Sequence, residues 1–361
     1  MNSLKALVRN SVLTNLSWRN EIRMKKYLKM MTNSLFFQNH LRYGLVGDEI
    51  RIEASSKCQL KCPICPTATG ENRRRPIGWG NLSFQNFQVF VDRYTGIRKI
   101  ELSNWGEMFL NPELLEILRY GHEKGVVLTA GNGVNLNTAR DDVLEALVKY
   151  QLRAMTVSID GATNESYRQY RVGGDFDKVI QRIEKINHYK ELYNSPYPKL
   201  VWQFIIFGHN EHEIAQAREM ADRLNMLFFP KLNAYSVYAP VKDQDAVKKD
   251  SGLTVASREE FKQKGKRYYG MPCEQLWFSP QVNWDGKLFG CCVNGWMDFG
   301  NVFESGLTEC IKGERYQYAK QMLMGVKKAR KDMPCTTCPY YRRDEALMFQ
   351  RGNKEQKEKE A

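Results

Sequence analysis

Residues 55–66 read Ser-Ser-Lys-Cys-Gln-Leu-Lys-Cys-Pro-Ile-Cys-Pro and directly follow an alternating, strand-like run at 49–54. This stretch places Cys58, Cys62 and Cys65 on one short loop with the spacing Cys-x3-Cys-x2-Cys. Three thiolates on such a loop can hold three irons of a cubane 4Fe–4S cluster, which leaves the fourth iron open to a small molecule. Electron-carrying clusters and structural zinc sites close with four ligands instead. Zinc with a fourth ligand from elsewhere in the chain is the alternative interpretation.

The cysteines gather in two places. Three lie in this loop, six lie in the last quarter of the chain, and none lies between 66 and 272. The N-terminus lacks the apolar run and cleavage site of a signal peptide, and no apolar run of about 18 residues is present, so we expect a cytoplasmic protein without a transmembrane segment. In that compartment, clustered cysteines indicate metal or redox chemistry before disulfides.

The charge of the chain is uneven. The 361 residues are 42% hydrophobic and 26% charged, which is ordinary for one large or two moderate globular domains, and the net charge is +13. Residues 1–45 supply about half of that charge, with eight Lys or Arg against the single acid Glu21. A basic helical segment could contact a membrane surface, an acidic partner or a nucleic acid. We favour a solvated basic face on a helix that packs against the protein, and expect no nucleic acid partner.

From about residue 48 the pattern alternates between strand and helix. Helix start signals are Ser83 as an N-cap, Asn111-Pro112 with proline at the first helical position, and Asp175 before an apolar stripe. Six strand–helix units predict an α/β fold with a parallel sheet and helices outside it, short of the eight units of a full barrel. Chemistry in such folds lies at the carboxyl ends of the strands. The predicted strands are 49–54, 98–103, 126–130, 154–159, 200–207 and 227–232.

The cysteine loop resembles the signature of the radical S-adenosylmethionine (SAM) enzymes. The resemblance covers about residues 48–340 and implies a partial (β/α)6 TIM-type barrel. It also implies that SAM chelates the open iron and is cleaved reductively to methionine and a 5′-deoxyadenosyl radical, which removes a hydrogen atom from the substrate. Ile64 departs from the aromatic residue often found before the third cysteine, which leaves the ligation itself unaffected.

Residues after the predicted strands match further SAM-binding motifs of this family. Gly106 and Glu107 resemble a Gly-Glu-Pro motif that meets the amino group of SAM, with Met108 in place of the proline. Asn132, in the sequence Gly-Asn-Gly after the third strand, resembles the family's Thr-Asn-Gly turn. Gly208 follows the fifth strand, where the family binds adenine and ribose.

The end of the fourth strand carries Ser158 and Asp160, and Arg171 follows about a dozen residues later. The resemblance implies that Ser158 and Arg171 hold the methionine carboxylate and ribose, and a guanidinium suits bidentate carboxylate binding. The structural alternative is that Ser158 caps the next helix and Arg171 lies on the surface.

The C-terminal cysteines form a second set, Cys273-x17-Cys291 followed by Cys335-x2-Cys338. The hairpin signal Trp-Asp-Gly at 284–286 would bring Cys273 and Cys291 to one site. Four thiolates make a closed centre that suits zinc or a cluster equally on spacing alone. The pattern resembles the SPASM/twitch extensions of radical SAM enzymes, and its four-cysteine spacing is similar to that of the twitch domain of the aminocyclitol dehydrogenase of butirosin biosynthesis. That resemblance implies an auxiliary 4Fe–4S cluster, and we predict one only because no cysteine follows Cys338.

We expect different roles for the two remaining cysteines. Cys292 is an alternative to Cys291 as a ligand, and Cys310 is expected to pack in the core. The expected divisions of the chain are 1–47 as a basic helical segment, 48–270 as the partial barrel, 271–345 as the auxiliary cluster domain and 346–361 as a charged tail.

The expected activity is a two-electron oxidation. The substrate would be a hydroxyl-bearing small molecule, a sugar or aminocyclitol, with the auxiliary cluster accepting an electron and a flavodoxin or ferredoxin supplying the reducing electron. No catalytic base can be assigned from the sequence. The first alternative is a peptide-modifying radical SAM enzyme that forms a crosslink or inverts a stereocentre. The second is a non-catalytic zinc protein that binds RNA.

Overall fold

The computed structural model describes residues 44, 45, 47–235, 237–263, 272–323 and 327–341. Residues 1–43 and 46 of the basic helical segment expected at 1–47, and the whole charged tail expected at 346–361, lie outside the described residues. The chain divides into two compact units. The larger unit comprises Glu49–Gly270 and Val282–Asp285, and the described part of the smaller unit lies within 44–48, 272–281 and 286–341.

A parallel sheet organises the larger unit. Its spatial order is β6-β5-β4-β3-β2-β1, and each successive pair is parallel. The short strand β7 (Gln281–Val282) continues the sheet beyond β1, where Glu53 N donates to Val282 O at 3.0 Å. All six predicted strands are confirmed, as β1 (Glu49–Ile52), β2 (Lys99–Glu101), β3 (Val127–Val134), β4 (Ala154–Ser158), β5 (Lys199–Ile206) and β6 (Met226–Leu232).

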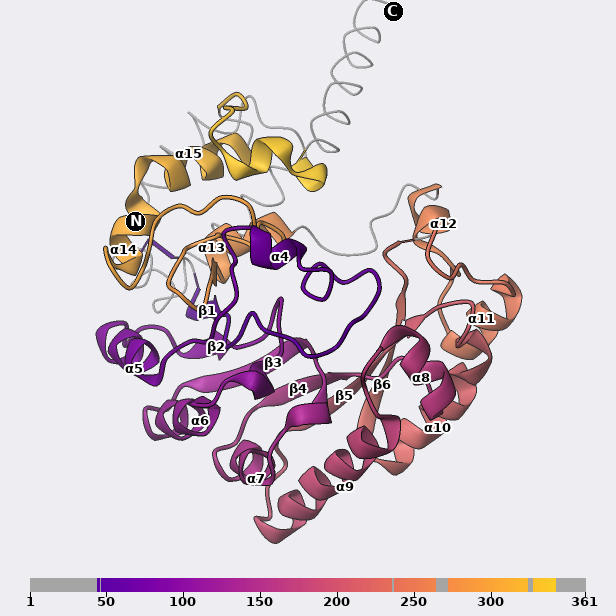
Figure 1. Ribbon diagram of the computed structural model, residues 1–361. Coiled ribbons are helices and arrows are strands. Elements are labelled where there is room, and N and C mark those ends of the chain that lie inside the picture. The colour runs from indigo at the N-terminus through magenta and orange to yellow at the C-terminus, as the bar shows by residue number, and fades with distance from the viewer. Residues whose placement is uncertain (1–43, 46, 236, 264–271, 324–326, 342–361) are drawn as a thin grey trace, which may run out of the picture. The chain divides into compact units, whose positions relative to one another are not determined.

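Helices lie along the outside of this sheet, and α5, α6, α7 and α9 follow one another there (Figure 1). The expected N-caps are present, because Ser83 Oγ accepts from Asn86 N and Asp175 Oδ1 accepts from Lys178 N. The bounds are α4 (Glu71–Arg74), α5 (Phe84–Arg93), α6 (Leu114–Glu123), α7 (Asp141–Lys149), α8 (Asn164–Tyr170), α9 (Phe176–Leu192), α10 (Ile214–Arg223), α11 (Gln244–Ser251) and α12 (Arg258–Gln263). Three 3-10 turns are η2 (Met108–Leu110), η3 (Leu136–Thr138) and η4 (Glu211–Glu213).

The expected start of α6 is wrong. Proline 112 was placed at the first helical position, but the helix begins at Leu114 with Glu113 as its N-cap. The reason is the buried side chain of Asn111, which donates to Ala54 O and Leu82 O and accepts from Glu113 N. These bonds fix the segment before the helix as a turn.

The third strand is longer than expected. We placed Asn132 and its flanking glycines in a turn after the strand, but β3 continues to Val134, with a register shift between Ala130 and Val134. Gly133 has φ +103°, and a Cβ there would overlap Ser158 Oγ. Glycine therefore permits both the irregular backbone and the close approach of β4 at this point.

The two faces of the sheet differ in polarity. On β5, Trp202 and Phe204 are fully buried on the helix-covered face, where Trp202 lies 6.3 Å from the Phe176 ring of α9. Burying such a side chain contributes about 1.5–3 kcal/mol. Residues one position along point to the opposite, inner face because strands alternate, and this face carries buried polar groups such as Glu101 and Gln203. The inner face is therefore built for polar chemistry rather than for packing alone.

The smaller unit is mostly short helices. They are η5 (Pro272–Glu274), α13 (Gln275–Phe278), α14 (Leu307–Lys312), α15 (Glu314–Leu323) and η6 (Pro334–Thr337). Tyr316 of α15 is fully buried, donates to Leu276 O at 2.8 Å and packs edge-on against Phe299. The chain folds back at the predicted hairpin, since Phe289 N donates to Gln281 O at 2.8 Å and Gly286 has φ +90°. None of the described helices is long and apolar enough to cross a membrane.

Candidate active site

The cysteine loop after β1 groups one buried and two half-buried thiols. Cys62 is 3% exposed, and Cys58 and Cys65 pack against the same apolar cluster of Leu60, Tyr170 and Phe207. Burial, and then the charge of Glu107, raises the pKa of the Cys58 thiol to about 12, and burial also raises the pKa of Cys62. Three neighbouring cysteine thiols on one loop are a donor set that fits soft metal ligation.

The loop is held against the end of β2 through backbone contacts. Glu107 N donates to Lys57 O at 2.7 Å. Gly106 lies flat against the backbone before Cys58, and a Cβ at Gly106 would overlap the carbonyl oxygen of Ser55. Glu53 at the end of β1 accepts from the amides of Trp105 and Gly106 at 2.9–3.1 Å. The Gly-Glu motif and the cysteine loop therefore form one rigid element.

Glu107 is buried at the centre of this element. Its carboxylate accepts from Phe109 N and from the backbone and side-chain amides of Asn135. Burial raises the pKa of Glu107 to about 8, although the backbone hydrogen bonds act in the opposite direction. The carboxyl is thus placed to interact with the Cys58 side of the loop. Its role toward the amino group of SAM stays a prediction.

A buried ion pair lies on the Cys62 side of the loop. Arg171 Nε donates to Asp160 Oδ2 at 2.6 Å, with side-chain exposures of 14% and 0%. An Arg171 terminal nitrogen lies 4.0 Å from Cys62 Sγ. Asp160 also accepts from Ile205 N, so the pair is tied to β5. The alternative that Arg171 lies on the surface is wrong, because α8 ends beside the cysteine loop and carries Arg171 inward.

The other predicted SAM contacts have separate partners. Ser158 Oγ accepts from Gln203 Nε2 at 3.1 Å and does not cap a helix, since it lies within β4. Asn132 Nδ2 donates to Asn104 Oδ1 at 2.6 Å. Gly208 N donates to Ala239 O at 2.8 Å. The structure therefore brings Gly106, Glu107, Asp160 and Arg171 to the cysteine loop, and the SAM-binding roles of all seven residues stay predictions.

Several residues of the site were missed from the sequence. Glu53 and Asn135 support the Gly-Glu element, and Gln203 and Lys231 lie on the inner face of the sheet. The available signal was a polar residue at an inward-facing strand position, where an apolar one is usual. Reading that signal requires knowing which face of each strand points inward.

The second cysteine set gathers in the smaller unit. Burial is the largest cause of the raised pKa of Cys291, followed by Cys292, and Cys273 also contributes. Burial likewise raises the pKa of Cys335, followed by the proximity of Cys273 and Cys338. Cys338 N donates to Cys335 O at 3.0 Å. Cys292 lies beside Cys291 and its amide donates to Gln275 Oε1, so the choice between the two as ligand stays open.

Cys310 belongs to a different environment. It is 5% exposed on α14, and after burial the causes of its raised pKa are acidic neighbours, Glu309 first among them. Among the described residues, no three His, Cys, Asp or Glu side chains are arranged to hold a single metal ion. A cubane cluster requires a different arrangement from a single metal ion, because each cysteine ligates its own iron.

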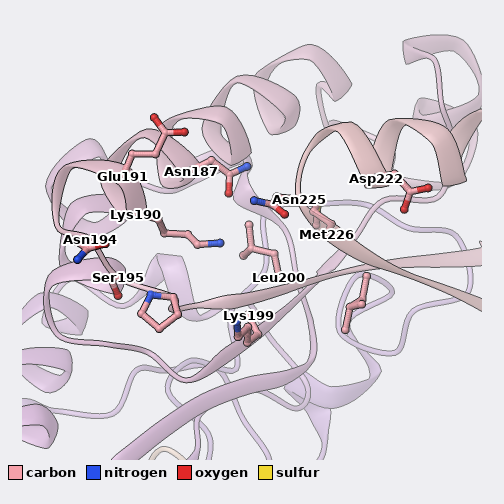
Figure 2. Close-up of a pocket in the computed structure, with 12 residues that line it drawn as sticks. Asn187, Lys190, Glu191, Asn194, Ser195, Lys199, Leu200, Asp222, Asn225 and Met226 are labelled. Atoms are coloured by element: carbon pink, nitrogen blue, oxygen red, sulfur yellow. The ribbon is translucent and has the colours of Figure 1, made fainter.

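A surface pocket lies at the opposite end of the sheet. It has a volume of about 870 Å³ and is lined by residues such as Lys199 and Leu200 at the start of β5 and Met226 and Leu227 at the start of β6. Figure 2 shows Lys190, Asn187 and Asn225 around the same space. These are the amino ends of the strands, whereas the thiols and the Asp160–Arg171 pair lie at the carboxyl ends. The pocket is therefore separate from the candidate active site.

Comparison with protein families gives two matches. Residues 52–221 match the radical SAM superfamily, and residues 273–339 match the SPASM family, described as an iron–sulfur cluster-binding domain. The fold and the cysteine loop thus define a radical SAM enzyme. The chain belongs to the radical SAM proteins that also carry a SPASM domain, and the two domains imply SAM, a 4Fe–4S cluster that binds SAM, and auxiliary iron–sulfur ligation.

Curated relatives match over part of their length. An AdoMet-dependent heme synthase of Methanosarcina barkeri is 30% identical over 135 residues, which are 37% of this chain and 37% of that protein. A probable GTP 3′,8-cyclase of Archaeoglobus fulgidus is 25% identical over 183 residues, which are 51% of this chain and 57% of that protein. The matched region thus spans between about a third and three fifths of these relatives.

Solved structures show a similar fold. SuiB of Streptococcus suis, in a complex with its precursor peptide SuiA, has a TM-score of 0.57 at 13% sequence identity, with 90% of this chain and 82% of SuiB covered. BtrN in a complex with AdoMet and 2-DOIA has a TM-score of 0.47 at 14% identity, with 81% of this chain and 93% of BtrN covered. At these identities the likeness to SuiB shows the fold alone.

Proposed function

We propose that this radical SAM enzyme oxidises a hydroxyl group of a small molecule, a sugar or an aminocyclitol, to a carbonyl. The observation that carries the proposal is the division of the cysteines into two sets of buried and half-buried thiols, one of three on the β1 loop and one of four in the SPASM domain. Three ligands leave a site open to SAM, whereas four close a centre that can exchange electrons. A two-electron oxidation needs both kinds of site, because the second electron must leave the substrate after the hydrogen atom.

The bound cofactors supply a radical that removes a hydrogen atom and an auxiliary centre that accepts an electron. The side chains of this protein would bind and orient SAM. The pairing of Arg171 with Asp160 beside Cys62 supports a role in binding a carboxylate such as that of methionine in SAM. The proximity of Glu107 to Cys58 supports a role in accepting hydrogen bonds from the ammonium group of SAM. The apolar cluster around Leu60, Tyr170 and Phe207 packs against the thiols and lowers their contact with water.

The proposal extends to partners and location. A reducing protein such as a flavodoxin or ferredoxin would deliver the electron that starts the reaction, and the protein would work in the cytoplasm. The clustering of the cysteines and the resemblance to radical SAM enzymes support the proposed reducing partner and the proposed location.

The experiment is a substrate screen under anaerobic conditions. The reconstituted enzyme, SAM and dithionite are incubated with a panel of cyclitols, aminocyclitols, hexoses and nucleotide sugars, and 5′-deoxyadenosine and carbonyl products are quantified. We expect one panel member to give equal amounts of 5′-deoxyadenosine and carbonyl product. Crosslinking or epimerisation of a precursor peptide, with no panel member oxidised, would replace this proposal with the peptide-modifying alternative.

A further inference from the structure

Lys231 lies on the inner face of β6. Strand residues alternate, so 227, 229 and 231 share one face. The opposite face packs on the outer helices, since the Arg218 guanidinium of α10 lies 4.9 Å from the Phe228 ring and Leu232 is 1% exposed. Leu227 and Phe229 on the inner face are 69% and 45% exposed. This side of the sheet interior therefore presents an open apolar wall with one cationic group at its carboxyl end.

A chain of hydrogen bonds holds that group in place. Lys231 Nζ donates to Gln203 Oε1 at 2.9 Å, and Gln203 Nε2 donates to Ser158 Oγ at 3.1 Å. The three side chains come from adjacent strands, because Ser158 pairs with Gln203 between β4 and β5, and β5 pairs with β6. Gln203 and Ser158 are 5% and 4% exposed. The amine is thus oriented by two buried side chains.

The same amine faces the cysteine end of the site. Ile205 pairs with Lys231 across the two strands, and Ile205 N donates to Asp160, the partner of Arg171. The charged groups around Lys231 are Arg258 at the start of α12, Asp160 after β4 and Arg171 after α8. Burial first, and then Arg258, lowers the pKa of Lys231 to about 8, although Asp160 acts in the opposite direction. A lysine in this state exchanges a proton near neutral pH.

We propose that Lys231 contacts the substrate hydroxyl as its proton acceptor, and that Gln203 and Ser158 position the amine for that role. This proposal rests on the proposed function, and it identifies the base that deprotonates the substrate hydroxyl in that reaction. Oxidation of an alcohol to a carbonyl removes one hydrogen atom from carbon, one proton from oxygen and one electron. The neutral Lys231 amine would take the proton and become an ammonium, while the hydrogen atom would pass to the 5′-deoxyadenosyl radical and the electron to the auxiliary centre that the bound cofactors would supply. Atoms and charge then balance without a further reactant.

The first arm of the test uses variants of the reconstituted holoenzyme and the substrate panel above. Lys231→Met keeps the side-chain length but has no proton-accepting group. We expect it to lower carbonyl product formation at least 100-fold, the lower range for loss of a general base. Production of 5′-deoxyadenosine without substrate should stay within about twofold of wild type. Lys199→Met, on β5 at the opposite end of the sheet, is the matched control and should match wild type in both assays.

A second variant separates proton transfer from support of the fold. Gln203→Glu places a carboxylate beside Lys231, which favours the ammonium and should move the pH midpoint of product formation upward by at least about one unit. A purely structural lysine would leave the midpoint in place. Normal product formation by Lys231→Met, or loss of 5′-deoxyadenosine in that variant without substrate, overturns the proposal, since the second result would assign Lys231 to SAM binding.

The last arm does not depend on turnover. Competitive amine labelling of the holoenzyme across pH 6–11, read by peptide mass spectrometry, should give Lys231 a midpoint near 8. A midpoint near 10 for Lys231 overturns the inference. If the wild-type enzyme oxidises no panel member, the proposed function fails by itself, and this labelling result still decides whether Lys231 is a neutral amine at working pH.

Discussion

Arg171 donates a 2.6 Å hydrogen bond to Asp160 inside the larger unit, and the same guanidinium lies 4.0 Å from Cys62 Sγ. Asp160 therefore orients the arginine and offsets its burial, while one terminal nitrogen lies beside Cys62. Asp160 is the carboxylate that pairs with Arg171 among the described residues, so the guanidinium retains donors for a second anion, which we propose is the carboxylate of SAM.

Arg171→Ala should weaken SAM binding. A charge-assisted hydrogen bond contributes about 1.5–3 kcal/mol, so we expect SAM affinity to fall about 10- to 100-fold, measured by titration of the reduced enzyme with electron paramagnetic resonance detection. Arg168→Ala is the control, because Arg168 lies on the same helix in an exposed pair with Asp175. Unchanged affinity in a folded Arg171→Ala protein would show that Arg171 does not bind the SAM carboxylate.

Gly106→Ala should prevent assembly of the cysteine loop. The added Cβ would meet backbone atoms of 55–57, which cannot move aside as a side-chain tip can. We expect the variant to lose about four of the eight irons per chain that two cubane clusters provide. Gly125→Ala is a control, because its Cβ meets nothing within 4 Å and the change costs only the strain of φ +68°, about 1 kcal/mol. The measurement is the iron content after anaerobic reconstitution. A full iron complement in Gly106→Ala would contradict the tight contact between Gly106 and the backbone of 55–57.

Replacing Cys335 and Cys338 together with alanine should separate the two centres. We expect the variant to keep about four irons and to cleave SAM with dithionite, but not to release carbonyl product from a substrate that wild type oxidises. Cys310→Ala should keep about eight irons, because Cys310 packs on α14. Circular dichroism must show that both variants fold, since a four-thiolate centre also stabilises its domain. Full product formation by the folded double variant would assign the auxiliary centre a structural role only.

Glu53→Gln should change how stability depends on pH. Burial raises the pKa of Glu53 to about 8, so the folded protein holds a proton there that the unfolded chain releases above about pH 4.5. Stability contributed by this group is present below the unfolded pKa and is lost as pH rises toward 8. Between pH 6 and 8.5 wild type should lose on the order of 2 kcal/mol that the amide variant keeps. Parallel urea unfolding curves at both pH values measure this, and an equal pH dependence in the two proteins would contradict it.

The sequence by itself determined the class of the protein. Cysteine spacing is a local property, so Cys58, Cys62 and Cys65 could be assigned to one loop, and Cys335 and Cys338 to one turn, before any fold was known. The six strands could be predicted equally well from the sequence, because a run of alternating or apolar residues between turn signals reports burial directly. Both results depend on residues that are near neighbours along the chain.

Only the tertiary structure decided which distant residues share the site. Arg171 reaches Cys62 because α8 ends at that point, and Lys231 reaches Gln203 because β5 and β6 pair in one register. The turn expected at Asn132 became part of β3, since pairing with β4 extends the strand past its glycines. Register and helix ends depend on packing between elements far apart in sequence, and a shift of one residue would turn Lys231 from the inner face to the outer one. That is why the place of Lys231 beside Gln203 was not predictable from the sequence, whereas the grouping of the cysteines on one loop was.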